Sequence, residues 1–297
     1  MTDITFYVPG SRHYDNGLYA NRRGSFVNIS ITGAECQCYC DHCQGQVLRH
    51  MLPAPNSAAL VRLAEDLCKD GCCGVLVSGG AGRDGAVPLL PFGAALKKLG
   101  EMGLAVVVHP GLLTEETVDM LVKANVTGVA LDLIGDPDTI REVYHLEHVP
   151  GDYRRSLRLA RRAGLPVMPH IVVGLHYGRL RGEYAALDMV VAEGAANLIF
   201  VILDPLDGTK MKAVRPPAPA EIEQLFKAAR RLLPELPLTL GCARPPGNFA
   251  RVVERLAVNA GFNAIAYPAR ETVDYVQSIG GKVTYQQTCC GLIPAKS

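Results

Sequence analysis

Four cysteines fall within eight residues near the start of the chain, in the run Cys36-Gln-Cys38-Tyr-Cys40-Asp-His42-Cys43. Cys36, Cys40 and Cys43 follow a Cys-x3-Cys-x2-Cys spacing, and Cys38 lies inside it. Three thiolates on one compact loop can bind three irons of a [4Fe–4S] cluster and leave the fourth iron open to a substrate or cofactor. The alternative is a structural zinc loop, although zinc sites have four ligands, usually as two separated cysteine pairs. The spacing alone favours iron–sulfur binding and does not exclude zinc.

The other six cysteines fall into two groups by their surroundings. Three of them lie in or beside apolar segments and are interpreted as small buried hydrophobic residues: Cys68, Cys72 and Cys73. Cys289 and Cys290 are adjacent in a polar tail, where thiols gain little from packing, and Cys242 ends a predicted strand. If the tail folds back onto the domain, these three thiolates and that of Cys38 can meet. The four cysteines are therefore candidate ligands of a second, auxiliary cluster.

Strand-like and helix-like segments alternate along the chain. Eight short apolar runs are typical of parallel strands covered on both faces: Phe26–Thr32, Gly74–Ser78, Leu104–His109, Gly128–Leu133, Pro166–Val173, Leu198–Leu203, Leu238–Gly241 and Asn263–Tyr267. Amphipathic helical patterns lie between several of them: Ser57–Asp70, Thr114–Ala124, Asp152–Ala163, Pro219–Leu233 and Asn248–Ala260. Eight right-handed βαβ units close into a barrel. The expected fold class is α/β, a single (β/α)8 TIM-type barrel over residues 1–297, with an N-terminal extension at 1–25 and a C-terminal tail at 283–297 over the barrel mouth.

Active sites of such barrels lie in the loops at the carboxyl ends of the strands. Outside the cysteine loop, the notable residues at these ends are Ser78, Gly79, Gly80, His109, Asp132, His176, Asp204 and Arg244. His109, His170 and His176 end or follow strands, so at least one of them is expected to face the active site. Arg244, beside Cys242, can bind a carboxylate or a cluster, with a surface salt bridge as the alternative. His109, His176 and Arg244 are therefore candidate catalytic residues.

The charge balance excludes several classes of function. The 297 residues include 30 Lys and Arg against 29 Asp and Glu, so a net charge of +1 gives no electrostatic basis for a nucleic-acid or anionic-membrane partner. No apolar stretch reaches the roughly 18–20 residues that span a bilayer, and the N-terminus is too polar for a signal peptide. A soluble, cytoplasmic protein is expected. Disulfides rarely persist in a reducing cytosol, which favours metal binding as the reason for ten cysteines.

A Cys-x3-Cys-x2-Cys loop after the first strand of a β/α barrel resembles the radical S-adenosylmethionine (SAM) superfamily. The resemblance implies that Cys36, Cys40 and Cys43 hold a [4Fe–4S] cluster whose open iron chelates the amino and carboxylate groups of SAM. The position before the last cysteine is typically aromatic in that family and lies near the adenine. Here that position is His42, which the resemblance makes a cofactor-binding residue.

Further cofactor-binding residues follow from the same resemblance. The turn Ser78–Gly80 resembles the family's Gly-Gly-Glu turn after the second strand, whose backbone meets the methionine amino group. Ala81 replaces the acidic residue of that turn, so a side-chain contact there is not implied. Asp132, on the fourth predicted strand, corresponds to polar residues that bind ribose hydroxyls in relatives. Asp204, at the end of the sixth strand, is another cofactor-binding candidate.

Within the superfamily, three stretches resemble the biotin synthase group: Pro169–Gly178, Ile202–Thr209 and Gly241–Gly247. They are most similar to a branch that includes the subunits of the bipartite lipoyl synthase, in which two related radical proteins insert two sulfurs into a protein-bound octanoyl chain. Biotin synthase holds its sulfur-donor cluster with cysteines on middle strands, whereas this chain has none at the corresponding strand ends. A donor cluster of the biotin synthase type is therefore not expected, and the four other cysteines named above remain for a different one.

The resemblance implies an activity and a set of partners. A reduced cluster cleaves SAM to methionine and a 5′-deoxyadenosyl radical, which takes hydrogen from an unactivated C–H bond of octanoyl-lysine at C6 or C8. The implied partners are an octanoylated carrier protein (a lipoyl domain or a glycine-cleavage H-type protein), a paralogous radical SAM subunit, and an electron donor such as ferredoxin or flavodoxin. Two alternatives stay open: another enzyme of the biotin synthase group without a donor cluster, such as a mutase or methylating enzyme, and a non-catalytic zinc-binding barrel.

Overall fold

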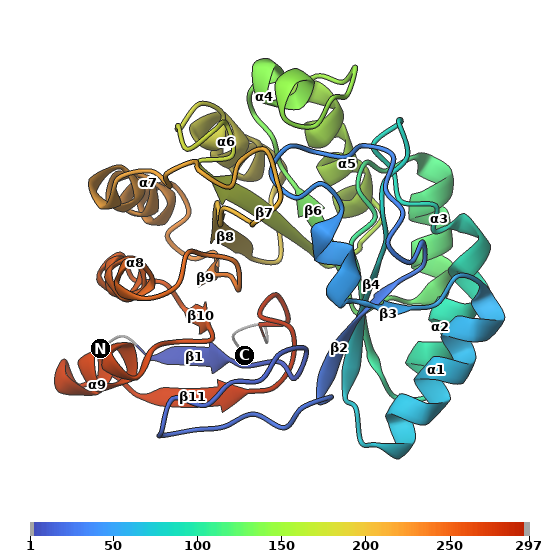
Figure 1. Cartoon of the computed structure of the whole chain (residues 1–297), viewed down its shortest axis with the longest axis horizontal. Coiled ribbons are helices and arrows are strands. Elements are labelled where there is room, and N and C mark those ends of the chain that lie inside the picture. Colours follow the sequence, from blue (N-terminus) through green and yellow to red (C-terminus); the bar gives the residue numbers. More distant parts are fainter. Residues whose placement is uncertain (1–2, 294–297) are drawn as a thin grey trace.

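The computed structural model describes residues 3–293. All eight predicted strands are present, and each pairs in parallel with the next along the chain. They are β2 (Phe26–Ser30), β4 (Gly74–Ser78), β5 (Ala105–Val108), β6 (Gly128–Asp132), β7 (Val167–Val173), β8 (Leu198–Ile202), β9 (Leu238–Leu240) and β10 (Ala264–Ala266). The strands curl around a common interior (Figure 1), which confirms the predicted α/β barrel architecture.

Three further strands extend this sheet, which stays open. β1 (Ile4–Tyr7) pairs with β10, β11 (Val283–Gln286) pairs with β1, and β3 (Leu52–Pro53) pairs with β2. Within residues 3–293 no ladder joins the edge strands β11 and β3, so the sheet does not close there as a complete barrel would. The reason is that both chain ends contribute strands, which occupy the β10 edge that would otherwise pair with β2.

Helices surround the outer face of the sheet (Figure 1). They are α1 (Ser57–Lys69), α2 (Gly93–Glu101), α3 (Glu115–Ala124), α4 (Pro137–Glu142), α5 (Pro150–Arg162), α6 (Glu183–Glu193), α7 (Pro219–Leu232), α8 (Asn248–Asn259) and α9 (Arg270–Ser278), with 3-10 turns η1 (Gln46–His50) and η2 (Leu90–Phe92). Asn56 caps α1 by accepting a bond from Ala59 N at 2.9 Å, because the first amides of a helix lack internal partners. Within residues 3–293, the helices are all too short or too polar to cross a bilayer.

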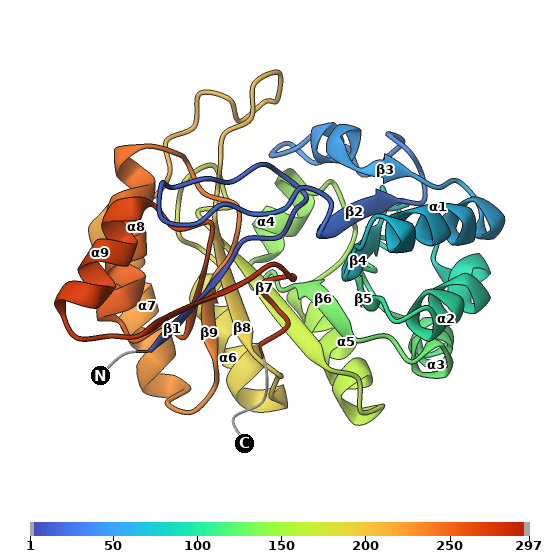
Figure 2. The same ribbon diagram turned by 90° about the horizontal axis from the view of Figure 1, so that it is seen from below.

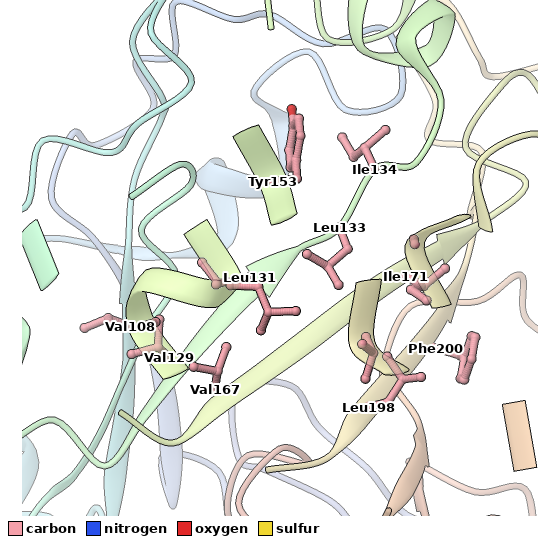
Figure 3. Close-up of a cluster of buried hydrophobic side chains, with 14 of the residues drawn as sticks. Val108, Val129, Leu131, Leu133, Ile134, Tyr153, Val167, Ile171, Leu198 and Phe200 are labelled. Atoms are coloured by element: carbon pink, nitrogen blue, oxygen red, sulfur yellow. The ribbon is translucent and has the colours of Figure 1, made fainter. Parts of the chain in front are cut away.

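The main hydrophobic core lies between the sheet and these helices. Figure 3 shows the part where outward-facing side chains of β5 to β8 pack together under α5. Val129, Leu131 and Val167 there are almost completely buried, as is Tyr153 of α5. Burying each such aliphatic side chain stabilises the fold by about 1.5–3 kcal/mol. The core therefore holds the middle strands, and with them the loops at their carboxyl ends, in fixed positions.

A second apolar cluster fills the barrel interior toward the amino ends of the strands. Its members are Phe26, Val107, Ala130, Met168 and Ile199, with the partly buried Leu76, Val201, Cys289 and Leu292 packed against them. Asn197, just before β8, donates from Nδ2 to the carbonyl oxygen of Gly291 at 2.5 Å. A Cβ at Gly291 would lie 2.5 Å from Met168 Sδ, so a larger residue would fit here only if the Met168 side chain moved. Residues 289–292 thus lie inside the barrel (Figure 1), and the prediction that the tail covers the mouth is wrong for them.

The N-terminal extension also lies against the carboxyl end of β10, where Cys290 of the tail is buried in the same apolar cluster as Ala266 and Tyr267. Tyr14 Oη donates to Pro268 O at 2.7 Å, and the Arg12 guanidinium lies 3.8 Å from the ring centre of Tyr267. Such a cation–π contact contributes about 0.5–2 kcal/mol, depending on desolvation. The extension is therefore a packed part of the barrel rim.

The three cysteines near α1 only partly follow the sequence-based interpretation. Cys72 is buried and Cys68 is half-buried, as expected of small hydrophobic residues. Cys73 is exposed, because the chain turns there from α1 into β4, and its Sγ lies 2.9 Å from Ser25 O. The expectation that Cys73 is buried is wrong.

A buried ion pair joins β9, β10 and α8. Arg244 donates from Nη2 and Nε to Glu254 Oε1 at 2.7 and 3.1 Å, and the side chains are 5% and 1% exposed. Its remaining acceptors are the backbone oxygens of Gly241, Ala266 and Tyr267. Glu254 also accepts through Oε2 from Thr272 Oγ1. Breaking a buried pair by removing one partner leaves an uncompensated charge, which is strongly destabilising.

We expect Arg244→Met to lower the free energy of unfolding by about 3–5 kcal/mol, because Glu254 would remain buried without its cation. The matched control is Arg251→Met, which removes an exposed partner of Glu271 and should cost no more than about 1 kcal/mol. Urea unfolding followed by circular dichroism measures both. Equal effects of the two substitutions would show that the Arg244–Glu254 pair does not hold the barrel wall together.

Candidate active site

A cavity of about 330 Å³ lies between the cysteine loop and the carboxyl ends of β4, β5 and β6. Ten residues singled out from the sequence line it: Cys36, Cys38, Cys40, His42, Cys43, Ser78, Gly79, Gly80, His109 and Asp132. Its apolar wall includes Leu76, Val87, Leu112 and Leu146. Cavities that bind small molecules have volumes of roughly 300–1,000 Å³ and mostly apolar walls with a few polar groups. Size and lining are therefore those of a small-molecule site.

The four thiols of the cysteine loop contact one another, Cys36 with Cys38, Cys38 with Cys40, and Cys40 with Cys43. Contacts from Cys36 and Cys40 lower the pKa of Cys38 to about 3. The Cys40 thiol, with help from His42, lowers the pKa of Cys43 to about 4. The same contacts raise the pKa of Cys36 and of Cys40. Metal clusters bind thiolates, so a loop that gathers sulfurs and favours ionisation of some of them suits such a ligand.

The glycine turn after β4 packs directly against the cysteine loop. Gly80 N donates to Thr32 Oγ1 at 2.7 Å, and a Cβ on Gly80 would lie 2.5 Å from Cys36 Cα. No larger residue therefore fits at this position. Ser78 Oγ donates to His109 O at 2.9 Å, which ties the end of β4 to that of β5. The turn thus forms one wall of the cavity and fixes the first cysteine.

Three ionisable side chains from β6, β7 and the residue after β5 meet in the interior beside the cavity. His109 Nε2 lies 3.5 Å from Asp132 Oδ1, and the His109 and His170 ring centres are 6.0 Å apart. Burial opposes ionisation of Asp132, but His109 more than offsets this and lowers the pKa of Asp132 to about 2. Burial likewise opposes protonation of His109, yet Asp132 raises its pKa. Burial and then the nearby His109 lower the pKa of His170 to about 4. At neutral pH the site therefore holds an Asp132 carboxylate and an uncharged His170.

Sequence reasoning missed several residues that line the cavity. Tyr144 reaches it from the segment between α4 and α5 and Tyr153 from the first turn of α5, and the Tyr144 ring centre lies 5.3 Å from that of His42. No strand ends in that segment, so the rule that directs attention to strand ends does not find it. Asn28 lines the cavity from β2. A polar residue at an inward position of an otherwise apolar strand was the signal that could have found it.

The residues present fit a [4Fe–4S] cluster with SAM. The thiols lie on one side of the cavity, and Nδ1 of His42 and Nε2 of His109 are buried without a hydrogen-bond partner in the described structure. Buried polar atoms are normally satisfied, so such atoms at a cavity wall indicate a missing ligand. Among residues 3–293 no three His, Cys, Asp or Glu side chains surround a point where one metal ion could bind. In an iron–sulfur cluster each thiolate binds a different iron, so the cysteines need not surround a single point. The absence of a single-ion site therefore does not argue against a cluster.

Three candidates lie outside this cavity. His176 Nδ1 lies 3.1 Å from Thr139 Oγ1, beside a separate small hollow next to α4. Asp204 follows β8 on the opposite side of the barrel, and burial raises its pKa while Arg12 opposes the shift. Arg244 donates its hydrogen bonds to Glu254 and to backbone oxygens, so this arginine stabilises the barrel wall.

The cysteines proposed for a second cluster are only partly brought together. Cys289 and Cys290 contact each other, and this contact lowers the pKa of Cys289 and raises that of Cys290. Burial raises the pKa of Cys242, and the charge of Cys289 adds to this shift. Cys289 packs in the interior cluster that includes Leu76, a residue of the cavity wall, and His109 lowers the pKa of Cys289 further. Cys38 lies instead among the thiols of the cysteine loop.

Comparison with known proteins agrees with this geometry. The sequence matches the Radical SAM superfamily over residues 30–179, which is half of the chain and contains the cysteine loop. It is 28% identical over 186 residues to a biotin synthase of Chlorobium phaeobacteroides, covering 60% of this chain and 54% of that protein. The chain spans about half the length of the curated relatives it matches.

Solved structures support the fold. Methylornithine synthase superposes with a TM-score of 0.61 at 15% identity, over 96% of this chain and 84% of that one. The FeFe-hydrogenase maturase HydG of Carboxydothermus hydrogenoformans superposes with a TM-score of 0.59 at 13% identity, over 95% and 68%. With the thiol-lined cavity at the strand ends and the family match across it, the chain belongs to the radical SAM superfamily, and the curated relatives that it resembles are biotin synthases.

Proposed function

We propose that this radical SAM enzyme inserts sulfur into an unactivated C–H bond of protein-bound octanoyl-lysine, as one half of a bipartite lipoyl synthase. The observation that carries the proposal is the pair of adjacent thiols, Cys289 and Cys290, that the tail brings into the barrel interior. Cys289 packs in the interior cluster with Leu76, which also lines the cavity of the cysteine loop, and the exposed Cys242 is the third candidate ligand. A sulfur-inserting enzyme of this family needs a sulfur source within reach of its radical site, and these thiols can hold one.

Cys36, Cys40 and Cys43 are the ligands we assign to the first cluster. When bound there, the cluster and SAM supply a radical that takes a hydrogen atom from a C–H bond which acid–base side chains cannot attack. The protein contributes orientation and exclusion of water. The apolar residues Leu112 and Leu146 line the cavity and help to exclude water from it.

The polar strand ends provide contacts for the nucleoside part of SAM. We assign Asp132 to the ribose hydroxyls, because its carboxylate stays ionised at neutral pH and accepts hydrogen bonds. We assign His42 to the adenine, since its ring lies in the cavity next to Tyr144. Ser78, Gly79 and Gly80 form the wall nearest Cys36 and are assigned to the methionine end.

The proposed partners follow from this reaction. An octanoylated carrier protein presents the substrate, a paralogous radical SAM subunit performs the other sulfur insertion, and a ferredoxin or flavodoxin supplies electrons. Cytoplasmic localisation is part of the same proposal, because reduced thiols and low-potential electron carriers are found there.

A second candidate function is a radical SAM reaction without sulfur donation, such as rearrangement or methylation. The packing of Cys290 favours it, because this thiol lies buried against Tyr7, Ala264 and Ala266. Cys38 also lies apart from the other three candidate ligands, so the interior group has three cysteines and not four. Iron content separates the two candidates: about eight irons per chain for two four-iron clusters, and about four for one.

Replacing Cys36, Cys40 or Cys43 by Ala should abolish release of 5′-deoxyadenosine from SAM by the reduced, anaerobically reconstituted protein. Each substitution removes one of three ligands that the cluster needs. Liquid chromatography of the nucleoside product gives the readout, and Cys72→Ala, a buried thiol outside the cavity, serves as the control. Formation of 5′-deoxyadenosine by a variant that lacks all three cysteines would refute the assignment of these ligands.

The triple replacement of Cys242, Cys289 and Cys290 by Ala should lower bound iron from about eight to about four per chain. It should preserve SAM cleavage and abolish sulfur insertion, because radical generation and sulfur donation use different thiols. Iron and sulfide analysis with the exposed Cys73→Ala as control measures the first effect. Unchanged iron in the triple variant would favour the reaction without a donor cluster.

Alone, the chain should add at most one sulfur to an octanoyl-lysyl peptide, since the proposal assigns the other insertion to the paralogous subunit. Mass spectrometry distinguishes the monothiolated peptide from the lipoyl product. Complete lipoyl formation by this chain alone would contradict the half-enzyme assignment.

A further inference from the structure

Asp41, between Cys40 and Cys43 in the cysteine loop, has a buried carboxylate with three side-chain partners. The side chain is 5% exposed. Its Oδ1 lies 2.7 Å from His145 Nε2 and 2.9 Å from Lys210 Nζ, and its Oδ2 accepts from Tyr177 Oη at 2.8 Å. A buried carboxylate is stable only when such partners compensate for lost hydration.

The three partners come from three different loops on the side of the barrel where the strands end. His145 lies between α4 and α5, Tyr177 between β7 and α6, and Lys210 between β8 and α7. Figure 2 shows the segments that follow β2 and β8 on this same side, at the top of the view. One carboxylate therefore connects the cysteine loop to the loops that follow β6, β7 and β8.

Backbone contacts add to this connection. Asp41 N donates to Val143 O at 2.9 Å, and Lys210 N donates to Gln44 Oε1 at 3.0 Å. The β8–α7 loop, residues 203–218, thus meets the cysteine loop through main chain as well as side chain. The end of the stretch Ile202–Thr209, which resembles the biotin synthase group, is a Pro-x-x-Gly-Thr turn of this loop. The turn lies at this junction, since a Cβ on Gly208 would lie 2.8 Å from Gln46 Nε2.

The backbone around Asp41 is held in conformations that non-glycine residues rarely adopt. Tyr39 and Gln44, on either side of it, have φ of 48° and 44°, and the partners His145 and Tyr177 have φ of 58° and 48°. Each such residue costs about 1–2 kcal/mol and persists only where surrounding contacts enforce it. The cysteine loop has no helix or strand between Ser30 and Gln46, so turn hydrogen bonds of its backbone and side-chain contacts together determine where its thiols point.

We propose that Asp41 is a positioning residue, which fixes the cysteine loop against the three neighbouring loops so that Cys40, His42 and Cys43 stay directed into the cavity. It touches neither substrate nor cofactor and acts through the residues beside it. The strain at Tyr39 and Gln44 is stored in this arrangement and is released when the carboxylate loses its partners. Loss of Asp41 consequently misplaces SAM more than it impairs cluster assembly, because the three cysteines remain.

Asp41→Asn in the full, reconstituted chain tests this directly. Iron content should stay near that of the wild type, while the KM for SAM rises about tenfold, since misplacement of about 1 Å is enough for effects of that size. The change in the electron paramagnetic resonance spectrum on adding SAM should be reduced. Asp138→Asn is the matched control, because this half-buried carboxylate pairs with Arg141 and Arg181 and does not contact the cysteine loop.

A second variant covers the case in which Asp41→Asn does not fold. Lys210→Met with Tyr177→Phe removes two partners from side chains that are partly exposed and leaves His145 in place. This double variant should raise the KM for SAM several-fold. In the protein that holds no cluster, it should also make trypsin cleavage after Lys212 faster. A wild-type KM, spectrum and cleavage rate in this double variant would overturn the proposal. So would an Asp41→Asn protein that only unfolds at lower temperature and otherwise binds SAM normally.

Discussion

The strands from β2 to β6 run in the same direction, so the loops that carry the thiols, the glycine turn and the His109–Asp132 pair all leave the sheet at one edge. The register fixes this closely, since Ser30 at the end of β2 pairs with Ser78 at the end of β4. Burial of the outer face under the helices supplies the free energy that holds the strands in this register. The loops at the carboxyl ends of these strands can therefore carry polar side chains and strained backbone that do not themselves stabilise the fold.

The barrel interior has an apolar part that stabilises the fold and a polar part that belongs to the site. Toward the amino ends of the strands it is apolar, and Leu292 from the tail completes the packing there. Toward the carboxyl ends it holds His109, His170 and Asp132, whose pKa values are shifted in opposite directions by burial and by one another. Cys289 lies at the boundary, where the chain passes from solvent into the apolar part. The tail thus contributes both packing and thiols, which explains why a polar sequence enters the interior at all.

Much of this could be predicted from the sequence because short apolar runs and their spacing determine a parallel sheet. The eight strands and the cavity lined by ten expected residues follow from that pattern. The pattern could not give β1 and β11, since each has only four residues and pairs only through tertiary context. The burial of the Arg244 salt bridge could not be predicted for a related reason. The partner Glu254 lies on a helix ten residues away, and a sequence does not show whether such a carboxylate is buried. Tyr144 and Asp41 depend on contacts between loops, which periodicity does not describe.

Two buried carboxylates show how rigidity is distributed around the site. Glu254 is satisfied within the barrel wall by Arg244 and Thr272, so its network closes on itself and holds β9, β10 and α8 together. Asp41 is satisfied by residues from three loops, one of which, Lys210, has a side chain that is 60% exposed. The free energy of an ion pair with one exposed partner is small, because water screens the exposed charge and competes for it. The cysteine loop is therefore held by several weak contacts that act together, whereas the wall is held by one strong pair. A site that must admit SAM requires this difference, since loops held only by buried pairs such as Arg244–Glu254 could not open without unfolding the barrel.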